Sequence, residues 1–189
     1  MTPFYVTSVG SVSEDILTAI ETAVWHVFGF ETRRVEALPE PLYALDPQRQ
    51  QFASVLILRE LLNRCPVDAA RLLAITERDL FIPMLSFVFG QAQLQGRVAL
   101  VSLARLRQEY YALPANPALL LARALKETIH ETGHTFGLVH CMDKRCPMSL
   151  SHTIQQVDSK SAELCTSCTI VLQDHIRITR TQIAASGKE

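Results

Sequence analysis

Apolar and polar residues alternate with two different periods along the chain, and this pattern predicts an α/β fold. The short runs 4–10 and 30–38 contain the β-branched and aromatic residues typical of strands, whereas apolar residues recur at helical spacing over 13–28 between them. Residues 71–81 predict another strand, and 84–106 predict two strands around a glycine-containing turn. Strands that alternate with helices in this order favour a mixed sheet covered by helices.

Other segments carry weaker patterns. A helix is predicted for 47–54, and the apolar run SVLILREL at 54–61 fits either a strand after that helix or its continuation, because short apolar runs suit both. The chain is polar and loop-like from Cys146 to Asp158. A last helix is predicted for 166–184. Its expected inward-facing residues are Leu172, Ile176 and Ile183.

One helix combines an apolar stripe with histidines on another face. Asn116 is placed to cap its first turn and Pro117 to begin it, and we expect the helix to end near Gly137. Residues four apart lie above one another on a helix, so His130 and His134 share a face, which is expected to line a cleft. The stripe comprises Leu121, Leu125 and Ile129, and the histidine face also carries Arg123, Lys126 and Glu127.

Composition and charge narrow the class of protein. The 189 residues are 48% apolar and 20% charged, the balance of a globular protein, and we expect one domain over 1–189. A net charge of −1 with scattered lysines and arginines argues against a nucleic-acid partner. The apolar stretches are far shorter than the ~20 residues that cross a bilayer, so we expect no membrane partner. The first residues lack a basic leader and a continuous apolar region, which predicts a cytoplasmic protein, and we expect a monomer.

The sequence HETGHTFGLVH has the ligand spacing of a catalytic zinc site. His130 and His134 present imidazoles from adjacent helical turns, as the H-E-x-x-H arrangement requires. Gly137 allows a sharp turn, after which His140 can return as a third ligand, leaving the fourth position open. Glu131 could then take a proton from a zinc-bound water. The alternative for each histidine alone is a half-buried side chain with a hydrogen-bond partner.

Four of the five cysteines have the spacing of a second zinc site. They form C-x4-C directly after His140 and a later C-x2-C, joined by a polar loop. In a reducing compartment this arrangement favours a closed, structural thiolate site over disulfides, although two disulfides or four separate buried thiols are alternatives. Cys65 is expected to be a free thiol. The predicted zinc ligands are Cys141, Cys146, Cys165 and Cys168.

The pattern H-E-x-x-H-x-x-G-x-x-H-C-x4-C-x-M, followed by C-x2-C, resembles the archaemetzincins among the metzincin zinc peptidases. The resemblance implies a compact metzincin fold with a mixed, mostly parallel twisted sheet, an active-site helix and a C-terminal helix, and it fits two zincs per chain. It implies that Met148 forms the Met-turn, an apolar floor beneath the histidines; an ordinary core methionine is the alternative. It also implies that a strand near 96–103 is the edge that pairs with a peptide substrate, unless that strand is interior.

The function implied by the resemblance is zinc-dependent peptide hydrolysis with Glu131 as general base, on short peptides or termini, with aminopeptidase action as one option. No tyrosine follows Tyr111, so the tyrosine that some metzincins place near zinc is missing. His152 and His175 are expected to be surface or hydrogen-bonded side chains. The alternative is a non-catalytic two-zinc binding module, against which Glu131 argues, because a structural metal gains nothing from a carboxylate beside an open position. A nucleic-acid-binding zinc module lacks the basic surface it needs.

Overall fold

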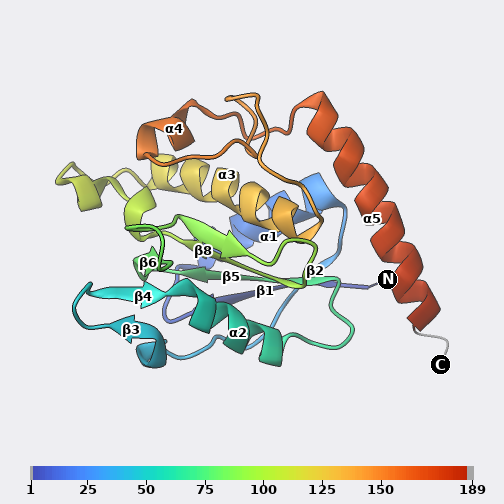
Figure 1. Ribbon diagram of the computed structural model, residues 1–189, viewed down its shortest axis with the longest axis horizontal. Coiled ribbons are helices and arrows are strands. Elements are labelled where there is room, and N and C mark those ends of the chain that lie inside the picture. Colours follow the sequence, from blue (N-terminus) through green and yellow to red (C-terminus); the bar gives the residue numbers. More distant parts are fainter. Residues whose placement is uncertain (1, 187–189) are drawn as a thin grey trace.

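A five-stranded sheet forms the centre of the molecule (Figure 1). The computed structural model describes the backbone of residues 2–186 and the side chains as far as residue 181. All neighbouring strands are parallel except the last pair, in which β7 runs antiparallel to β8, so the mixed, mostly parallel sheet is confirmed. The strands in spatial order are β2 (Thr32–Arg34), β1 (Phe4–Val9), β5 (Arg71–Thr76), β8 (Val98–Ser102) and β7 (Gly90–Ala92).

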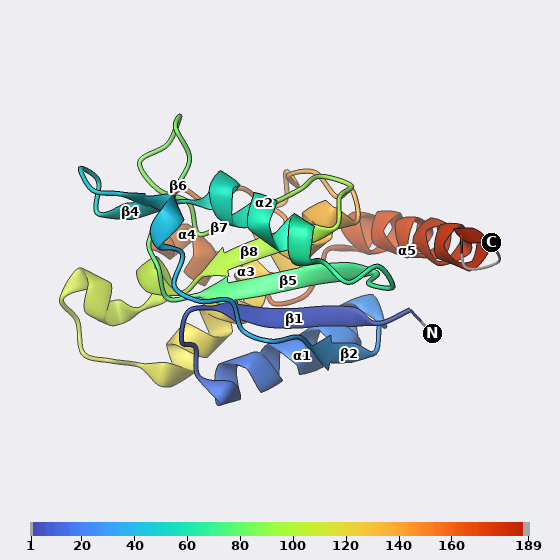
Figure 2. The same ribbon diagram turned by 90° about the horizontal axis from the view of Figure 1, so that it is seen from below.

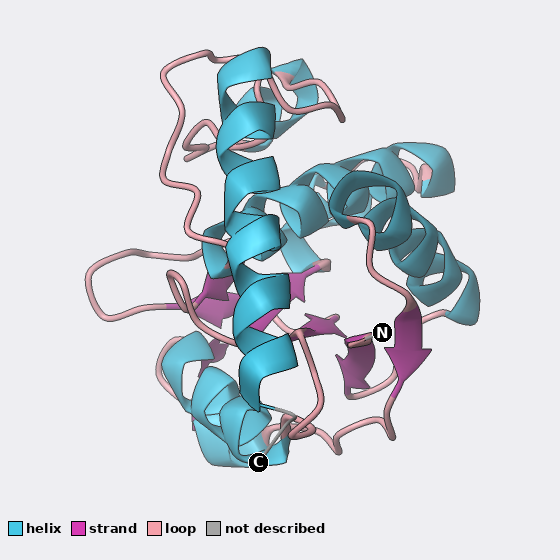
Figure 3. Cartoon of the chain, turned by 90° about the vertical axis from the view of Figure 1, so that its right-hand side faces the viewer, coloured by secondary structure: helices cyan, strands magenta, loops and turns pink. Residues whose placement is uncertain are grey.

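Helices cover both faces of this sheet (Figures 1 and 2). Helices α1 (Glu14–Phe28) and α3 (Pro117–Thr135) pack together on one face, and α2 (Ser54–Arg64) lies on the other. A small sheet of β3 (Leu45–Asp46), β4 (Gln51–Ala53) and β6 (Leu80–Phe81) adjoins α2. Helix α4 (Ile154–Ser159) follows the cysteine-containing loop, and α5 (Thr166–Ser186) runs along the outside of the molecule (Figure 3). Short 3-10 turns are η1 (Leu42–Ala44), η2 (Ala104–Leu106) and η3 (Gln108–Tyr111).

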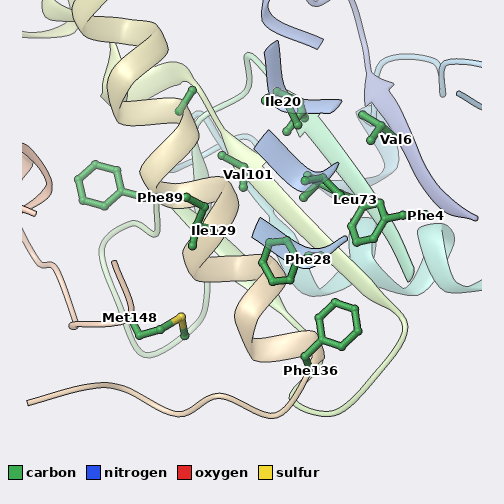
Figure 4. Packing of buried hydrophobic residues seen from close by; sticks show 14 of the residues in the cluster. Phe4, Val6, Ile20, Phe28, Leu73, Phe89, Val101, Ile129, Phe136 and Met148 are labelled. Carbon is green, nitrogen blue, oxygen red and sulfur yellow. The ribbon is translucent and has the colours of Figure 1, made fainter. Parts of the chain in front are cut away.

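The two central strands are buried on both faces. Leu73 of β5 and Val101 of β8 pack in the core shared with α1 and α3 (Figure 4), whereas the neighbouring Leu72 and Leu100 pack against α2. Successive strand residues point to opposite faces, so continuous apolar runs supply both cores. Within the part of the chain that the structure describes, no helix combines the length and apolar character needed to cross a membrane.

Helix α3 begins as predicted but buries more of its surface than one stripe. The Asn116 side chain accepts a hydrogen bond from the Leu119 amide at 3.0 Å, and Pro117 is the first helical residue. Ile129 is buried, but Leu121 and Leu125 are only half-buried. The buried positions lie one residue earlier, because α3 packs against the sheet, α1 and α4 at once. These positions are Leu120 and Ala124.

The prediction of a helix over residues 47–54 is wrong. The Asp46 carboxylate accepts the amides of Gln48 and Arg49 at 2.9 and 3.0 Å, which closes a turn in place of a helical start. Gln50 has a φ of 55°, and β4 follows. The helix begins only at Ser54, so the apolar run at 54–61 is helical.

The structure differs from the prediction in two further segments. The strand predicted for 71–81 is two strands, because residues 77–79 leave the main sheet, where Glu77 and Asp79 pair with Arg107 and Arg105. The stretch predicted as loop-like up to Asp158 contains α4, which begins with a reciprocal capping box between Thr153 and Gln156. In α5, Leu172 and Ile176 are buried as predicted, and Ile183 lies outside the described side chains.

Replacing Leu73 by alanine tests the core between the sheet and α1 and α3. Leu73 is fully buried, so Leu73→Ala is expected to lower the free energy of unfolding by about 3 kcal/mol in urea denaturation. Leu42→Ala is the control, because Leu42 is 70% exposed and its loss is expected to change stability by less than about 0.5 kcal/mol. Equal losses in the two variants would contradict this core assignment.

Candidate active site and metal centres

The three predicted histidine ligands converge on one point. One ring nitrogen from each of His130, His134 and His140 lies within 4.8 Å of the other two. Two of the rings are oriented by backbone carbonyls: His130 Nδ1 donates to the Pro147 carbonyl at 2.8 Å, and His134 Nδ1 donates to the Leu138 carbonyl at 2.7 Å. Since a carbonyl only accepts, each Nδ1 carries the proton and each Nε2 carries a lone pair.

This arrangement of nitrogens fits a metal ion. The lone pairs of His130 Nε2 and His134 Nε2 face each other at 3.1 Å, which is unfavourable unless a cation lies beside both. Burial lowers the pKa of His130 well below its ordinary value and also lowers the pKa of His134 and of His140, so the three rings are neutral near neutral pH. Neutral imidazoles are the form that binds zinc.

Glu131 is buried beside the histidines. Burial raises the pKa of its carboxyl well above the usual range, the neighbouring Glu127 carboxylate raises this pKa further, and Lys160 opposes both. The backbone of β7 closes one side of the Glu131 side chain: a Cβ atom at Gly90 would lie 2.5 Å from Glu131 Cγ and 2.7 Å from the Leu100 carbonyl oxygen. The glycine at this strand position therefore allows β7 to approach Glu131 closely.

A cleft of about 350 Å³ opens onto these groups. The histidines and Glu131 line one side, and strand β7 with the preceding segment 85–89 lines another. The prediction that the strand near 96–103 forms the edge is wrong, because β8 lies between β5 and β7 and β7 is the edge strand. The hairpin reverses at 93–97, which carries 90–92 outside β8.

The four predicted cysteine ligands form a second cluster. Their sulfur atoms all lie within 4.8 Å of one another. All five cysteines are free thiols, and the 3.7 Å between Cys141 Sγ and Cys165 Sγ is far beyond a disulfide bond, so the disulfide alternative is wrong. Burial raises the pKa of the Cys168 thiol, and contact with the other thiols raises it further. Four sulfur atoms in such a space are the donor set of a tetrahedral zinc site.

A three-residue segment connects the two clusters. Cys146 belongs to the thiol cluster, the Pro147 carbonyl accepts from His130, and the fully buried Met148 lies against the turn of α3 between the two histidines (Figure 4). A Cβ at Gly133 would lie 2.6 Å from Met148 Sδ. Met148 thus packs against α3 at Gly133, and its role as the Met-turn residue stays a prediction.

A buried ion pair beside the cleft was not predicted. Glu127 and Lys160 are 3% and 1% exposed at their side chains, and Lys160 Nζ lies 3.5 Å from Glu127 Oε1. Glu127 lies one turn before Glu131, which was a usable signal, but nothing in the sequence indicates a partner 33 residues away. His152 is exposed and lines the cleft, and His175 donates from Nδ1 to the Phe136 carbonyl, so both meet the expectation of surface or hydrogen-bonded side chains.

Known proteins resemble this chain in sequence and in fold. The model of peptidase family M54 matches residues 56–174. The archaemetzincin of Methanocaldococcus jannaschii is 46% identical over 169 residues, which cover 88% of this chain and 90% of that protein. The crystal structure of archaemetzincin from Methanopyrus kandleri aligns with a TM-score of 0.80 at 35% identity, covering 93% of this chain and 97% of that one. The archaemetzincin of Archaeoglobus fulgidus, complexed with malonate, aligns with a TM-score of 0.77 at 28% identity, covering 89% and 99%.

The contact between β7 and Glu131 can be tested at Gly90. Gly90→Ala is expected to lower the free energy of unfolding by about 1–3 kcal/mol in urea denaturation, because the added methyl group meets the Leu100 backbone as well as Glu131. Ala92→Gly in the same strand adds no atom and is expected to cost less than about 1 kcal/mol. A Gly90→Ala protein as stable as the unaltered chain would rule out this close approach.

Proposed function

This chain belongs to peptidase family M54, the archaemetzincins, and is a zinc-dependent metallopeptidase; from this premise we propose that His130, His134 and His140 hold its catalytic zinc and that Glu131 is its general base. The observation that carries this proposal is the convergence of three neutral imidazoles beside a buried carboxylate in one cleft. A non-catalytic binding module is not favoured, because such a module has no use for Glu131.

Zinc, Glu131 and strand β7 have different roles in the proposed hydrolysis. When bound, zinc supplies Lewis acidity that polarises a peptide carbonyl and activates water for attack. Glu131 takes the proton released by the attacking water and returns it to the nitrogen of the departing amine, so that the carboxylate is regenerated. Its burial favours this role, since a carboxyl with a raised pKa accepts a proton readily near neutral pH. Strand β7 keeps the carboxylate beside the histidines.

Peptide substrate is proposed to bind along β7. This strand is the edge of the five-stranded sheet and lines the cleft, so an extended peptide can pair with its outer side. The apolar side chains of Leu85, Phe87 and Phe89 lie along the same wall. This placement replaces the strand near 96–103 as the substrate-pairing edge. Short peptides or chain termini, a monomeric state and a single domain over 1–189 stay predictions.

The thiol cluster is proposed to hold a second, structural zinc, giving two zincs per chain. The close approach of four sulfur atoms supports this, because thiolates repel one another unless a cation neutralises them. The ligands of this second zinc would be Cys141, Cys146, Cys165 and Cys168. This zinc would order the loop that carries Pro147 and Met148. The Pro147 carbonyl on that loop orients the proposed ligand His130.

Glu131→Gln separates hydrolysis from metal binding. The amide keeps the shape of the side chain but accepts no proton, so peptide hydrolysis is expected to fall by at least about 100-fold while zinc content stays at about two per chain. Zinc is measured by elemental analysis and cleavage with a peptide library, with Glu36→Gln as the control because it makes the same change at an exposed glutamate that does not line the cleft. Unchanged hydrolysis in Glu131→Gln would refute the proposed base.

Cys165→Ser addresses the structural zinc. The variant is expected to contain about one zinc less per chain and to unfold at a lower temperature, because metal binding and folding are coupled. Cys65→Ser is the matched control, since Cys65 is a free thiol outside the cluster, and it is expected to leave zinc content unchanged. A Cys165→Ser protein with both zincs and unaltered melting temperature would contradict the structural site.

A further inference from the structure

The C-terminal end of α3 is held by three elements distant in sequence. The His134 carbonyl accepts from the Gln95 amide at 2.9 Å, in the turn between β7 and β8. The Thr135 carbonyl accepts from Arg71 Nε of β5 at 3.1 Å, and the Phe136 carbonyl accepts from His175 Nδ1 of α5. The last carbonyls of a helix have no partner within the helix, so external donors decide how the chain leaves it.

Arg71 contacts this helix end through more than one bond. Its guanidinium lies 4.4 Å from the centre of the Phe136 ring, and it pairs with no carboxylate among the described residues. Burial lowers the pKa of Arg71 to about 10, which leaves the group charged at neutral pH. A half-buried cation without an acidic partner is stabilised by the negative end of a helix dipole, which is where Arg71 lies.

His175 lies against the turn that follows α3. Gly137 has a φ of 89°, and a Cβ on it would lie 2.6 Å from His175 Nδ1. The same turn places the Leu138 carbonyl where it accepts from His134 Nδ1, and two residues later it delivers His140. Fixing the peptide units at 135–137 therefore fixes the orientation of one histidine and the return of another.

We propose that Arg71 and His175 are positioning residues for the histidine metal site, acting through the turn at 136–138. Neither residue lines the cleft; both line a separate pocket of about 300 Å³ behind the end of α3. Their contribution is to hold the Leu138 carbonyl and His140 in place before metal binds, so that binding does not have to order the turn. The inference rests on the proposed histidine zinc site.

Metal affinity distinguishes positioning from a general effect on stability. Metal-free protein is titrated with Co²⁺, and the sulfur-to-cobalt absorption band, which histidine ligation lacks, identifies the thiolate site separately. His175→Leu and Arg71→Met are each expected to weaken Co²⁺ binding at the histidine site about tenfold and to leave the thiolate site unchanged. His175→Asn, whose amide can still donate to the Phe136 carbonyl, is expected to restore affinity to within about threefold.

Arg180→Met is the matched control. Arg180 also lies on α5, donates to the Gly29 carbonyl after α1 at 2.6 Å and lies 5.0 Å from the Phe30 ring centre, so its loss removes the same kinds of contact from another helix end. Arg180→Met is expected to leave Co²⁺ affinity unaltered.

If His175→Leu and Arg71→Met lower only the melting temperature, as Arg180→Met does, positioning is refuted. If Arg71→Met does not fold, the His175 variants decide between positioning and a general effect on stability, because the His175 side chain is only half-buried. Absence of histidine-bound Co²⁺ in the unaltered protein would overturn the proposed function, and this inference with it.

Discussion

The hydrogen bond from His130 Nδ1 to the Pro147 carbonyl joins the histidine cluster to the loop of the thiol cluster. It determines which ring nitrogen of His130 is free for metal, and its acceptor lies between Cys146 of the thiol cluster and the buried Met148. The Met148 carbonyl in turn accepts from the Cys141 amide at 2.9 Å, closing the loop on itself. Ordering the thiol cluster therefore also orders the acceptor on which the His130 ring depends.

His134 depends on a second carbonyl of different origin. Its acceptor, Leu138, belongs to the turn after α3, and the carbonyls of residues 134–136 accept hydrogen bonds from the β7–β8 turn, β5 and α5. The two rings that these carbonyls orient bring His130 Nε2 and His134 Nε2 to 3.1 Å from each other. Without a cation the two lone pairs oppose this approach, so the surrounding packing must hold the rings together, which is the pre-organisation that a catalytic metal site requires.

Local chemistry made much of the site predictable from sequence, and tertiary contacts account for what was not. The four-residue spacing of His130 and His134, the turn at Gly137 and the cap at Asn116 depend on neighbouring residues only, and each is found as predicted. The order of strands depends on how a hairpin folds back, so the edge was assigned to β8 rather than to β7. The helix predicted for 47–54 failed because one carboxylate, Asp46, closes a turn that competes with helical periodicity.

Glycine is found at three places where other elements approach α3 or the turn after it closely. The absence of a side chain at these places lets several elements contact one helix. Gly90 admits β7 against Glu131, Gly133 admits Met148 against α3, and Gly137 admits His175 beside the turn. A methyl group at any of the three would meet an atom at 2.6 Å or less. Each approach bears on a different part of the proposed site, namely Glu131, Met148 and the path of the chain to His140. The helix is therefore positioned by close contact on several sides, and small displacements of any one neighbour reach the histidine nitrogens through packed atoms rather than through flexible loops.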